Sequence, residues 1–191
     1  GCAAGLIFRH VVDVLGENTV YLFPPHCMGV GSPRIANPRL LANFASSAAY
    51  ARGMYRGYKF RGSKVRVAVF AGDGGTVDIG LQSLSAAAEA GESVLFICYD
   101  NEAYMNTGIQ RSSSTPLGAW TTTTPAGSRW KGKKEIPKDM LGIMIAHKVP
   151  YIGTASPAFI RDMRTKIEKA KEVVDNDEGL AYLHILSPCP T

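Results

Sequence analysis

The sequence predicts an α/β fold with a parallel sheet and helices on both faces. Two apolar runs, residues 65–70 and 94–99, have the length of strands that are buried on both sides. A segment with helical spacing separates them, and the order strand, helix, strand is typical of a unit whose strands run parallel. A glycine-rich turn, residues 72–75, follows the first run directly, as expected where a ligand meets the end of such a strand.

The amino-terminal third begins with a predicted helix, because apolar side chains recur at helical spacing over residues 3–15. Residues 19–23 form a short apolar run that ends at two prolines, which stop regular structure. A glycine-rich loop is expected at residues 26–32. Residues 43–58 are rich in alanine and serine and are expected to form a closely packed helix.

The rest of the chain continues the alternation. A helix is expected over residues 77–90, because Gly91 provides a stop signal. The polar stretch from 100 to 125 is rich in Thr and Ser and is expected to be a long loop, and loops of this length are usually either functional or disordered. The later elements are expected to be a helix, a short strand, an amphipathic helix and a final strand, at residues 139–147, 151–152, 157–174 and 180–186.

The 191 residues are enough for one hydrophobic core, and we expect a single domain over residues 1–191 that is truncated at both ends. No apolar run reaches the roughly 18–20 residues that span a bilayer. The first residues also lack the layout of a signal peptide. We therefore expect a cytoplasmic protein without a membrane partner.

The formal net charge of +5 has three interpretations: an ordinary basic enzyme surface, an anionic cofactor or acidic protein partner, or nucleic acid. The Lys and Arg residues are scattered, apart from one small cluster at residues 129–134. No nucleic-acid motif accompanies them, so no nucleic-acid partner is expected.

Polar residues at the ends of two predicted strands have the chemistry of a diphosphate and metal site. Gly72, Gly74 and Gly75 let the backbone approach an anion closely. Asp73 offers a hard oxygen ligand for Mg²⁺, and Asn101 follows the next strand, 28 residues later. Parallel strands place these residues at one edge of the sheet. A Gly-Asp-Gly tripeptide alone is typical of an ordinary turn, and its spacing does not match a nicotinamide-binding fingerprint.

The whole unit resembles the metal-binding motif of thiamine-diphosphate enzymes, in which Gly-Asp-Gly is followed by an Asn at the end of the next strand. The resemblance implies the fold of the thiamine-diphosphate-binding domains. It also implies that Asp73, Asn101 and the carbonyl of Ala103 hold Mg²⁺ beside the diphosphate. Asp100 is a departure, because the family often has a second Asn at that position.

Longer segments narrow the resemblance to the β subunits of the pyruvate:ferredoxin oxidoreductases, within the 2-oxoacid:ferredoxin oxidoreductase family. These segments are residues 72–80, 99–116, 118–125 and 184–191. The resemblance implies that Asn106 lies beside the reactive ring of the cofactor and the substrate, and a loop-capping role is its alternative. Residues 24–39 depart from the pyruvate enzymes.

The family's β subunit carries one [4Fe–4S] cluster, and four ligands are normally needed. The resemblance implies that Cys2, Cys27 and Cys189 are the second, third and fourth of these ligands, with the first outside this chain. Cys27 also lies in the expected cofactor loop, next to His26. Cys98 lies in an apolar run and is expected to be a buried core thiol.

The resemblance implies a β subunit that decarboxylates a 2-oxoacid oxidatively with coenzyme A, pyruvate being the first candidate. Electrons would pass through the cluster to ferredoxin. It also implies partner subunits of the α, γ or δ type, one of which supplies a glutamate to thiamine diphosphate, so the chain alone is expected to be inactive. His10, His147 and His184 are expected to be packing or surface residues.

Three alternatives remain at this point. The first is a related oxidoreductase that acts on another 2-oxoacid or on oxalate. The second is a non-redox thiamine-diphosphate decarboxylase or synthase, which would need no cluster. The third is a non-catalytic subunit on the same fold.

Overall fold

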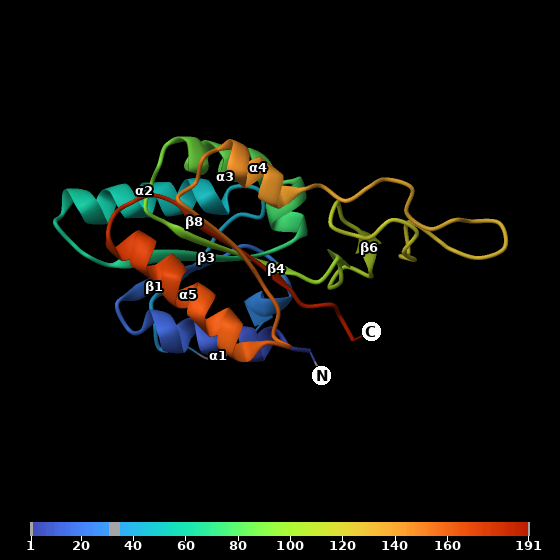
Figure 1. Ribbon diagram of the computed structural model, residues 1–191, viewed down its shortest axis with the longest axis horizontal. Coiled ribbons are helices and arrows are strands. Elements are labelled where there is room, and N and C mark those ends of the chain that lie inside the picture. The colour runs from blue at the N-terminus through green and yellow to red at the C-terminus, as the bar shows by residue number, and fades with distance from the viewer. Residues whose placement is uncertain (1, 31–34, 191) are drawn as a thin grey trace.

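The protein contains a six-stranded parallel sheet, seen in a computed structural model that describes residues 2–30 and 35–190 (Figure 1). The strand order is β2-β1-β3-β4-β8-β7. The strands are β1 (Thr19–Phe23), β2 (Arg39–Leu41), β3 (Arg66–Gly72), β4 (Leu95–Asp100), β7 (Tyr151–Ala155) and β8 (Ala181–Leu186). The predicted parallel sheet is therefore confirmed, and all its carboxyl ends lie at one edge.

Helices cover both faces of the sheet, as predicted (Figure 1). Helices α1 (Ala4–Leu15) and α5 (Ile160–Asp175) pack on one face. Helices α2 (Ser47–Phe60), α3 (Leu81–Glu89) and α4 (Met140–Ala146) pack on the other. None of the helices in the described part of the chain is long and apolar enough to cross a membrane.

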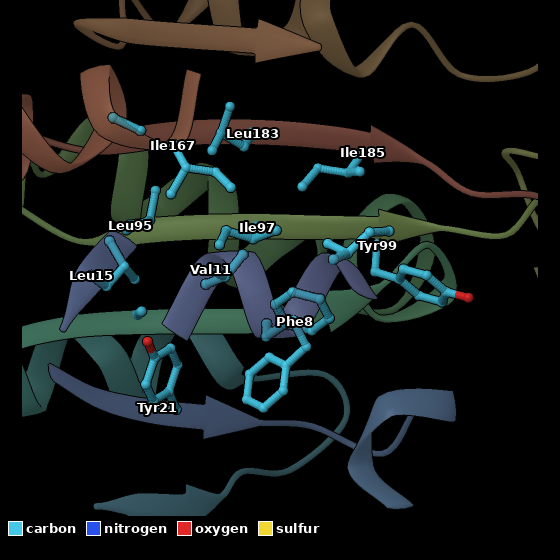
Figure 2. Close-up of a cluster of buried hydrophobic side chains, with 14 of the residues drawn as sticks. Phe8, Val11, Leu15, Tyr21, Leu95, Ile97, Tyr99, Ile167, Leu183 and Ile185 are labelled. Carbon is cyan, nitrogen blue, oxygen red and sulfur yellow. The ribbon is translucent and has the colours of Figure 1, made fainter. Parts of the chain in front are cut away.

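Aromatic side chains fill the core beneath α1. The ring of Phe8 makes edge-to-face contacts with Tyr21, Phe23 and Phe70, at centroid distances of 5.7, 5.4 and 5.4 Å. Figure 2 shows Phe8 lying between the helix and the strands, with aliphatic side chains of β4 and β8 continuing the same cluster. This cluster fixes α1 and the carboxyl end of β3 relative to each other.

The region after β3 differs from the single helix that was expected over residues 77–90. A π-helical turn (Gly74–Asp78) comes first, and α3 begins only at Leu81. The backbone is closely packed here, because a Cβ atom on Gly80 would lie 1.8 Å from the carbonyl oxygen of Gly75. The predicted stop is confirmed, since Gly91 has a φ of +65°.

Other boundaries were also predicted imperfectly. Helix α2 begins at Ser47 rather than at residue 43, and β7 extends to Ala155. The short strand β2 was missed because all three of its residues are exposed and carry no buried pattern. Within the expected glycine-rich loop, residues 27–30 form a 3₁₀ turn, and residues 31–32 lie outside the described part of the chain.

The long polar stretch after β4 contains a small antiparallel pair, β5 (Ala103–Tyr104) and β6 (Gln110–Arg111). It continues as an arm, residues 111–138, that extends away from the body of the protein before the chain returns to α4 (Figure 1). The expected loop is therefore present, but its first part is built onto the carboxyl edge of the sheet.

Candidate cofactor and metal site

A cavity of about 230 Å³ lies at the carboxyl edge of the sheet. Three chain segments that follow β1, β3 and β4 line it, together with Phe44 from the segment before α2. The lining residues include Pro25, His26, Cys27, Phe44, Gly72, Asp73, Gly74, Gly75, Tyr99, Asn101, Ala103, Tyr104, Met105, Asn106 and Thr107. The structure thus brings most of the sequence-predicted site residues into one place.

The three predicted Mg²⁺ ligands meet at the side-chain amide of Asn101. One terminal atom of this amide lies 3.2 Å from Asp73 Oδ1 and 2.7 Å from the carbonyl oxygen of Ala103. An amide can present either its nitrogen or its oxygen at such a position. With nitrogen inward, it donates to both oxygens. With oxygen inward, three oxygen atoms face one another, an arrangement that needs a cation between them.

Asp73 is almost completely buried, with 3% of its surface exposed. Burial raises the pKa of its carboxyl group to about 7, and the Asp100 carboxylate adds to the rise. Hydrogen bonds from Ser112 and from the backbone of residues 73 and 74 act in the opposite direction. A bound metal cation would stabilise the ionised form of this buried carboxyl group, because it replaces the hydration that burial removes.

The glycines beside Asp73 keep the cavity open. A Cβ atom on Gly74 would lie 2.1 Å from the ring of Tyr104, and one on Gly75 would lie 3.0 Å from the ring of Phe44. Only glycine therefore fits at Gly74 without displacing its neighbour. The donor set and this cradle fit a diphosphate held through Mg²⁺.

Ser112 is a site residue that the sequence did not single out. Its hydroxyl donates a short hydrogen bond to Asp73 Oδ2, so the second oxygen of this carboxylate is held from the arm. The neighbouring backbone N–H of Ser113 donates to Asp78 Oδ2 at 3.1 Å, and the Tyr104 hydroxyl donates to the same oxygen at 2.9 Å. The only sequence signal was that a serine run follows the predicted metal-binding segment closely.

Asn106, the predicted catalytic residue, lies at the rim of the cavity and is exposed. Cys27 lies deeper, with its Sγ atom 3.4 Å from the amide of Asn101. Burial raises the pKa of Cys27, and hydrogen bonds from Asn101 and from the backbone of Asn106 partly oppose that rise. Cys27 therefore connects the predicted cofactor site with the predicted cluster site.

The three predicted cluster ligands surround the same edge. Cys27 follows β1, Cys189 follows β8, and Cys27 lies against the amide of Asn101 at the end of β4. The Sγ atom of Cys2 lies 3.4 Å from the hydroxyl of Tyr99. Among the described residues, however, no three His, Cys, Asp or Glu side chains form a group that could hold a metal ion. Cys98 is buried in the core, as expected.

His184 contacts the site, although it was expected to be a packing or surface residue. Its Nε2 atom lies 2.7 Å from Asp100 Oδ2, at the residue before Asn101. The other histidines have structural partners: His10 lies 3.0 Å from Arg164, and His147 lies 3.0 Å from the hydroxyl of Ser85. The contact of His184 arises from the pairing of β4 with β8, which the sequence does not reveal.

His26 packs against the rings of Phe23 and Phe70, which also contact each other. Burial lowers its pKa to about 4, so the imidazole is neutral at ordinary pH. Its Nδ1 atom accepts a hydrogen bond from the backbone N–H of Met28 at 3.1 Å, which supports the 3₁₀ turn after β1. His26 thus shapes the wall of the cavity from behind Gly72.

A larger hollow, of about 530 Å³, lies at the opposite edge of the sheet. Most of its charged groups are paired with one another, Lys59 with Asp177 and Arg66 with Asp175. Such pairs leave few groups for a ligand, whereas the smaller cavity contains the buried carboxylate of Asp73 beside the Asn101 amide and the Ala103 carbonyl. The smaller cavity is therefore the better candidate for a site.

Residues 26–185 match the family described as "Thiamine pyrophosphate enzyme, C-terminal TPP binding domain". The chain is 48% identical over 197 residues to pyruvate synthase subunit PorB of Methanothermobacter marburgensis, a match that covers all of this chain and 67% of the relative. It is 43% identical to ketoisovalerate oxidoreductase subunit VorB of Pyrococcus horikoshii, covering all of this chain and 64% of that subunit. The chain thus spans about two thirds of the length of these relatives.

A third relative, the β subunit of NADH-dependent phenylglyoxylate dehydrogenase of Aromatoleum evansii, is 43% identical; this chain covers 44% of it. Among solved structures, the 2-oxoglutarate:ferredoxin oxidoreductase of Magnetococcus marinus has the same fold, with a TM-score of 0.87 and 23% identity over 100% of this chain and 63% of that one. The structural match supports the fold alone, whereas the sequence matches extend over the whole chain and show the family. The chain belongs to the thiamine-diphosphate-binding β subunits of the 2-oxoacid:ferredoxin oxidoreductase family.

Proposed function

We propose that this chain forms the thiamine-diphosphate and Mg²⁺ site of an oxidoreductase that decarboxylates a 2-oxoacid with coenzyme A and passes electrons to ferredoxin. The observation that carries the proposal is the convergence of Asp73, Asn101 and Ala103 beside the Gly72–Gly75 cradle. Thiamine diphosphate supplies the electron sink for decarboxylation when it is bound. The chain's own residues bind and orient it.

In this proposal, Asp73 supplies the charged ligand for Mg²⁺, and the Asn101 amide and Ala103 carbonyl supply two neutral ones. The backbone of the cradle would hold the diphosphate, and the rings of Tyr104 and Phe44 lie beside Gly74 and Gly75. Asn106, at the rim, faces the space where the reacting end of a ligand would lie, and we assign it the role of positioning the substrate.

Cys2, Cys27 and Cys189 are proposed as three of the four thiolate ligands of a [4Fe–4S] cluster, with the fourth supplied from outside this chain. The contacts of Cys2 with Tyr99 and of Cys27 with Asn101, two residues that line the cavity, support this assignment. Partner subunits of the same complex would supply the glutamate that activates the cofactor. A cytoplasmic location belongs to the proposal, since a reducing compartment preserves such thiols.

Pyruvate is the first candidate substrate, because the relative with 48% identity is named a pyruvate synthase subunit. The relatives named for ketoisovalerate and phenylglyoxylate, each 43% identical, favour a branched or aromatic 2-oxoacid as the second candidate. Comparing kcat/KM for pyruvate, 2-oxoisovalerate, phenylglyoxylate and 2-oxoglutarate in the assembled complex distinguishes them.

The metal site is tested by Asp73→Asn, which keeps the shape of the side chain but removes its charge. We expect Mg²⁺-dependent binding of thiamine diphosphate to weaken by about tenfold or more, because a charged ligand is lost. Calorimetric titration of the purified complex measures this affinity. Asp13→Asn is the control, since Asp13 pairs with Arg164 on the surface. Equal affinity in wild type and Asp73→Asn would remove the basis of the proposal.

The cluster is tested on the complete subunit, co-expressed with its neighbours and purified without oxygen. Cys27→Ala and Cys189→Ala should each lower iron and acid-labile sulfide in this subunit, together with the EPR signal after dithionite reduction. Cys98→Ala is the matched control, because that thiol is buried in the core. Iron that is unchanged in the first two variants would contradict the cluster and favour a non-redox thiamine enzyme.

A further inference from the structure

Glu102 adopts an unusual backbone conformation between two of the proposed metal ligands. Its φ is +68°, in the left-handed region that residues other than glycine rarely adopt. Asn101 and Ala103 lie on either side of it. Across this turn the Asn101 side-chain amide lies 2.7 Å from the Ala103 carbonyl oxygen. The metal-ligating geometry therefore depends on keeping Glu102 in this conformation.

Asp100 holds that turn. Its Oδ1 atom accepts a hydrogen bond from the backbone N–H of Glu102 at 2.8 Å, which closes a turn between the side chain of one residue and the backbone two residues later. The backbone of Asp100 is fixed as well, because its carbonyl accepts from the N–H of Ser187 at 2.7 Å. Asp100 is 5% exposed, so these bonds form away from competing water.

His184 orients the other oxygen of Asp100. Its Nε2 atom lies 2.7 Å from Asp100 Oδ2, and its Nδ1 atom lies 2.9 Å from the Tyr182 hydroxyl. With Nδ1 accepting from the Tyr182 hydroxyl, the ring carries its proton on Nε2, and this N–H donates a hydrogen bond to Asp100. Strand β8 is thereby connected through Asp100 to the loop that follows β4.

We propose that Asp100 and His184 are positioning residues for the Mg²⁺ of the cofactor site: Asp100 latches Glu102 in the left-handed conformation, and His184 orients Asp100. The inference rests on the proposed function, because it concerns the same metal. In this inference, Asp100 holds the backbone of Glu102 by accepting from its N–H, at a position where thiamine-diphosphate enzymes often have an asparagine. It also predicts that the effect of Asp100 is transmitted through the backbone of Glu102.

The test is a rescue experiment in the purified complex, with Mn²⁺ as the metal probe and thiamine diphosphate present. Binding is followed by the loss of the EPR signal of free Mn²⁺, which does not require turnover. Asp100→Ala should weaken Mn²⁺ binding by about tenfold to hundredfold, as for other residues that orient metal ligands. His184→Ala should act in the same direction. The double variant should be no worse than Asp100→Ala, because both act on one contact.

Glycine at position 102 should relieve the need for the latch, since glycine adopts positive φ without strain. Adding Glu102→Gly to Asp100→Ala should therefore recover affinity by about fivefold or more. Glu102→Ala is the matched control: it removes the same side chain but keeps the cost of the left-handed backbone, so it should not rescue. His147→Ala controls for loss of a histidine, because that ring bonds Ser85 elsewhere.

The outcomes separate this inference from the proposed function. If wild-type protein binds no Mn²⁺ in the presence of thiamine diphosphate, both are overturned. If wild type binds but Asp100→Ala binds equally well, or if Glu102→Ala rescues as well as Glu102→Gly, the inference alone is overturned. Should Asp100→Ala fail to fold, Asp100→Asn replaces it, because it retains an oxygen for the Glu102 N–H and should show a smaller loss of affinity that Glu102→Gly also reverses.

Discussion

Asp73 has its two carboxylate oxygens engaged by different partners. Oδ1 faces the Asn101 amide, and Oδ2 accepts from the Ser112 hydroxyl. In the metal-free protein, burial raises the pKa of this group from 3.8 to about 7. Between these two pH values the Asp73 carboxyl group is therefore protonated in the folded state and ionised in the unfolded state. Stability should therefore fall as the pH rises from about 4 to about 7.

This prediction is checked by urea unfolding of the metal-free subunit across that pH range, with Asp73→Asn as the reference. The difference in unfolding free energy between wild type and Asp73→Asn should become less favourable to wild type as the pH rises. Mg²⁺ with thiamine diphosphate should reverse the trend, because metal binding requires the carboxylate. Parallel pH profiles for the two proteins without metal would show that Asp73 does not titrate in this range.

Ser112 offers a second prediction at this scale, because it touches a proposed ligand without being one. Ser112→Ala should weaken Mg²⁺-dependent binding of thiamine diphosphate by about tenfold to hundredfold. Ser112→Thr, which keeps the hydroxyl, should restore most of it. Ser113→Ala is the neighbouring control, since residue 113 uses its backbone N–H to reach Asp78. The three affinities are compared by calorimetric titration, and a loss shared by both alanine variants would contradict a specific role for the Ser112 hydroxyl.

Among the elements, helix α1 contributes the aromatic side chain on which one face of the core is centred. Phe8→Ala should destabilise the protein by about 3–5 kcal/mol, because it leaves a cavity among Tyr21, Phe23 and Phe70. Leu6→Ala on the same helix should have a much smaller effect, since Leu6 is 39% exposed. Urea unfolding measures both. Equal losses would contradict a central packing role for Phe8.

The elements also show what a sequence reveals of a fold. The strands over residues 65–70 and 94–99 were predicted well, because strands buried on both faces appear as continuous apolar runs. The turn at Gly74–Asp78 was not predicted, since the close approach of Gly80 to the Gly75 carbonyl leaves no sign in the pattern of apolar residues. The same distinction applies to the candidate site. Local motifs indicated Asp73 and Asn101, whereas Ser112 and His184 reach the site only through tertiary structure.

At the scale of the whole molecule, the charge is unevenly distributed. The arm, residues 111–138, contains six Lys or Arg residues and one Glu, so its net charge of +5 equals that of the entire chain. Two exposed tryptophans, Trp120 and Trp130, lie on the same arm. The body is therefore neutral in sum, and the scattered pattern inferred from the sequence becomes a localised one once the arm extends from the sheet (Figure 1).

This distribution predicts how the chain meets the partner subunits of the proposed complex. An arm with several positive charges speeds encounter with an acidic surface, and salt screens the effect. Lys131→Glu combined with Lys134→Glu should lower the association rate constant at low salt and flatten its dependence on ionic strength. Lys169→Glu with Lys171→Glu, on α5, is the matched charge change on the body. Stopped-flow mixing of separately purified subunits provides the rates, and equal slowing by the two pairs would show that net charge, and not the arm, guides assembly.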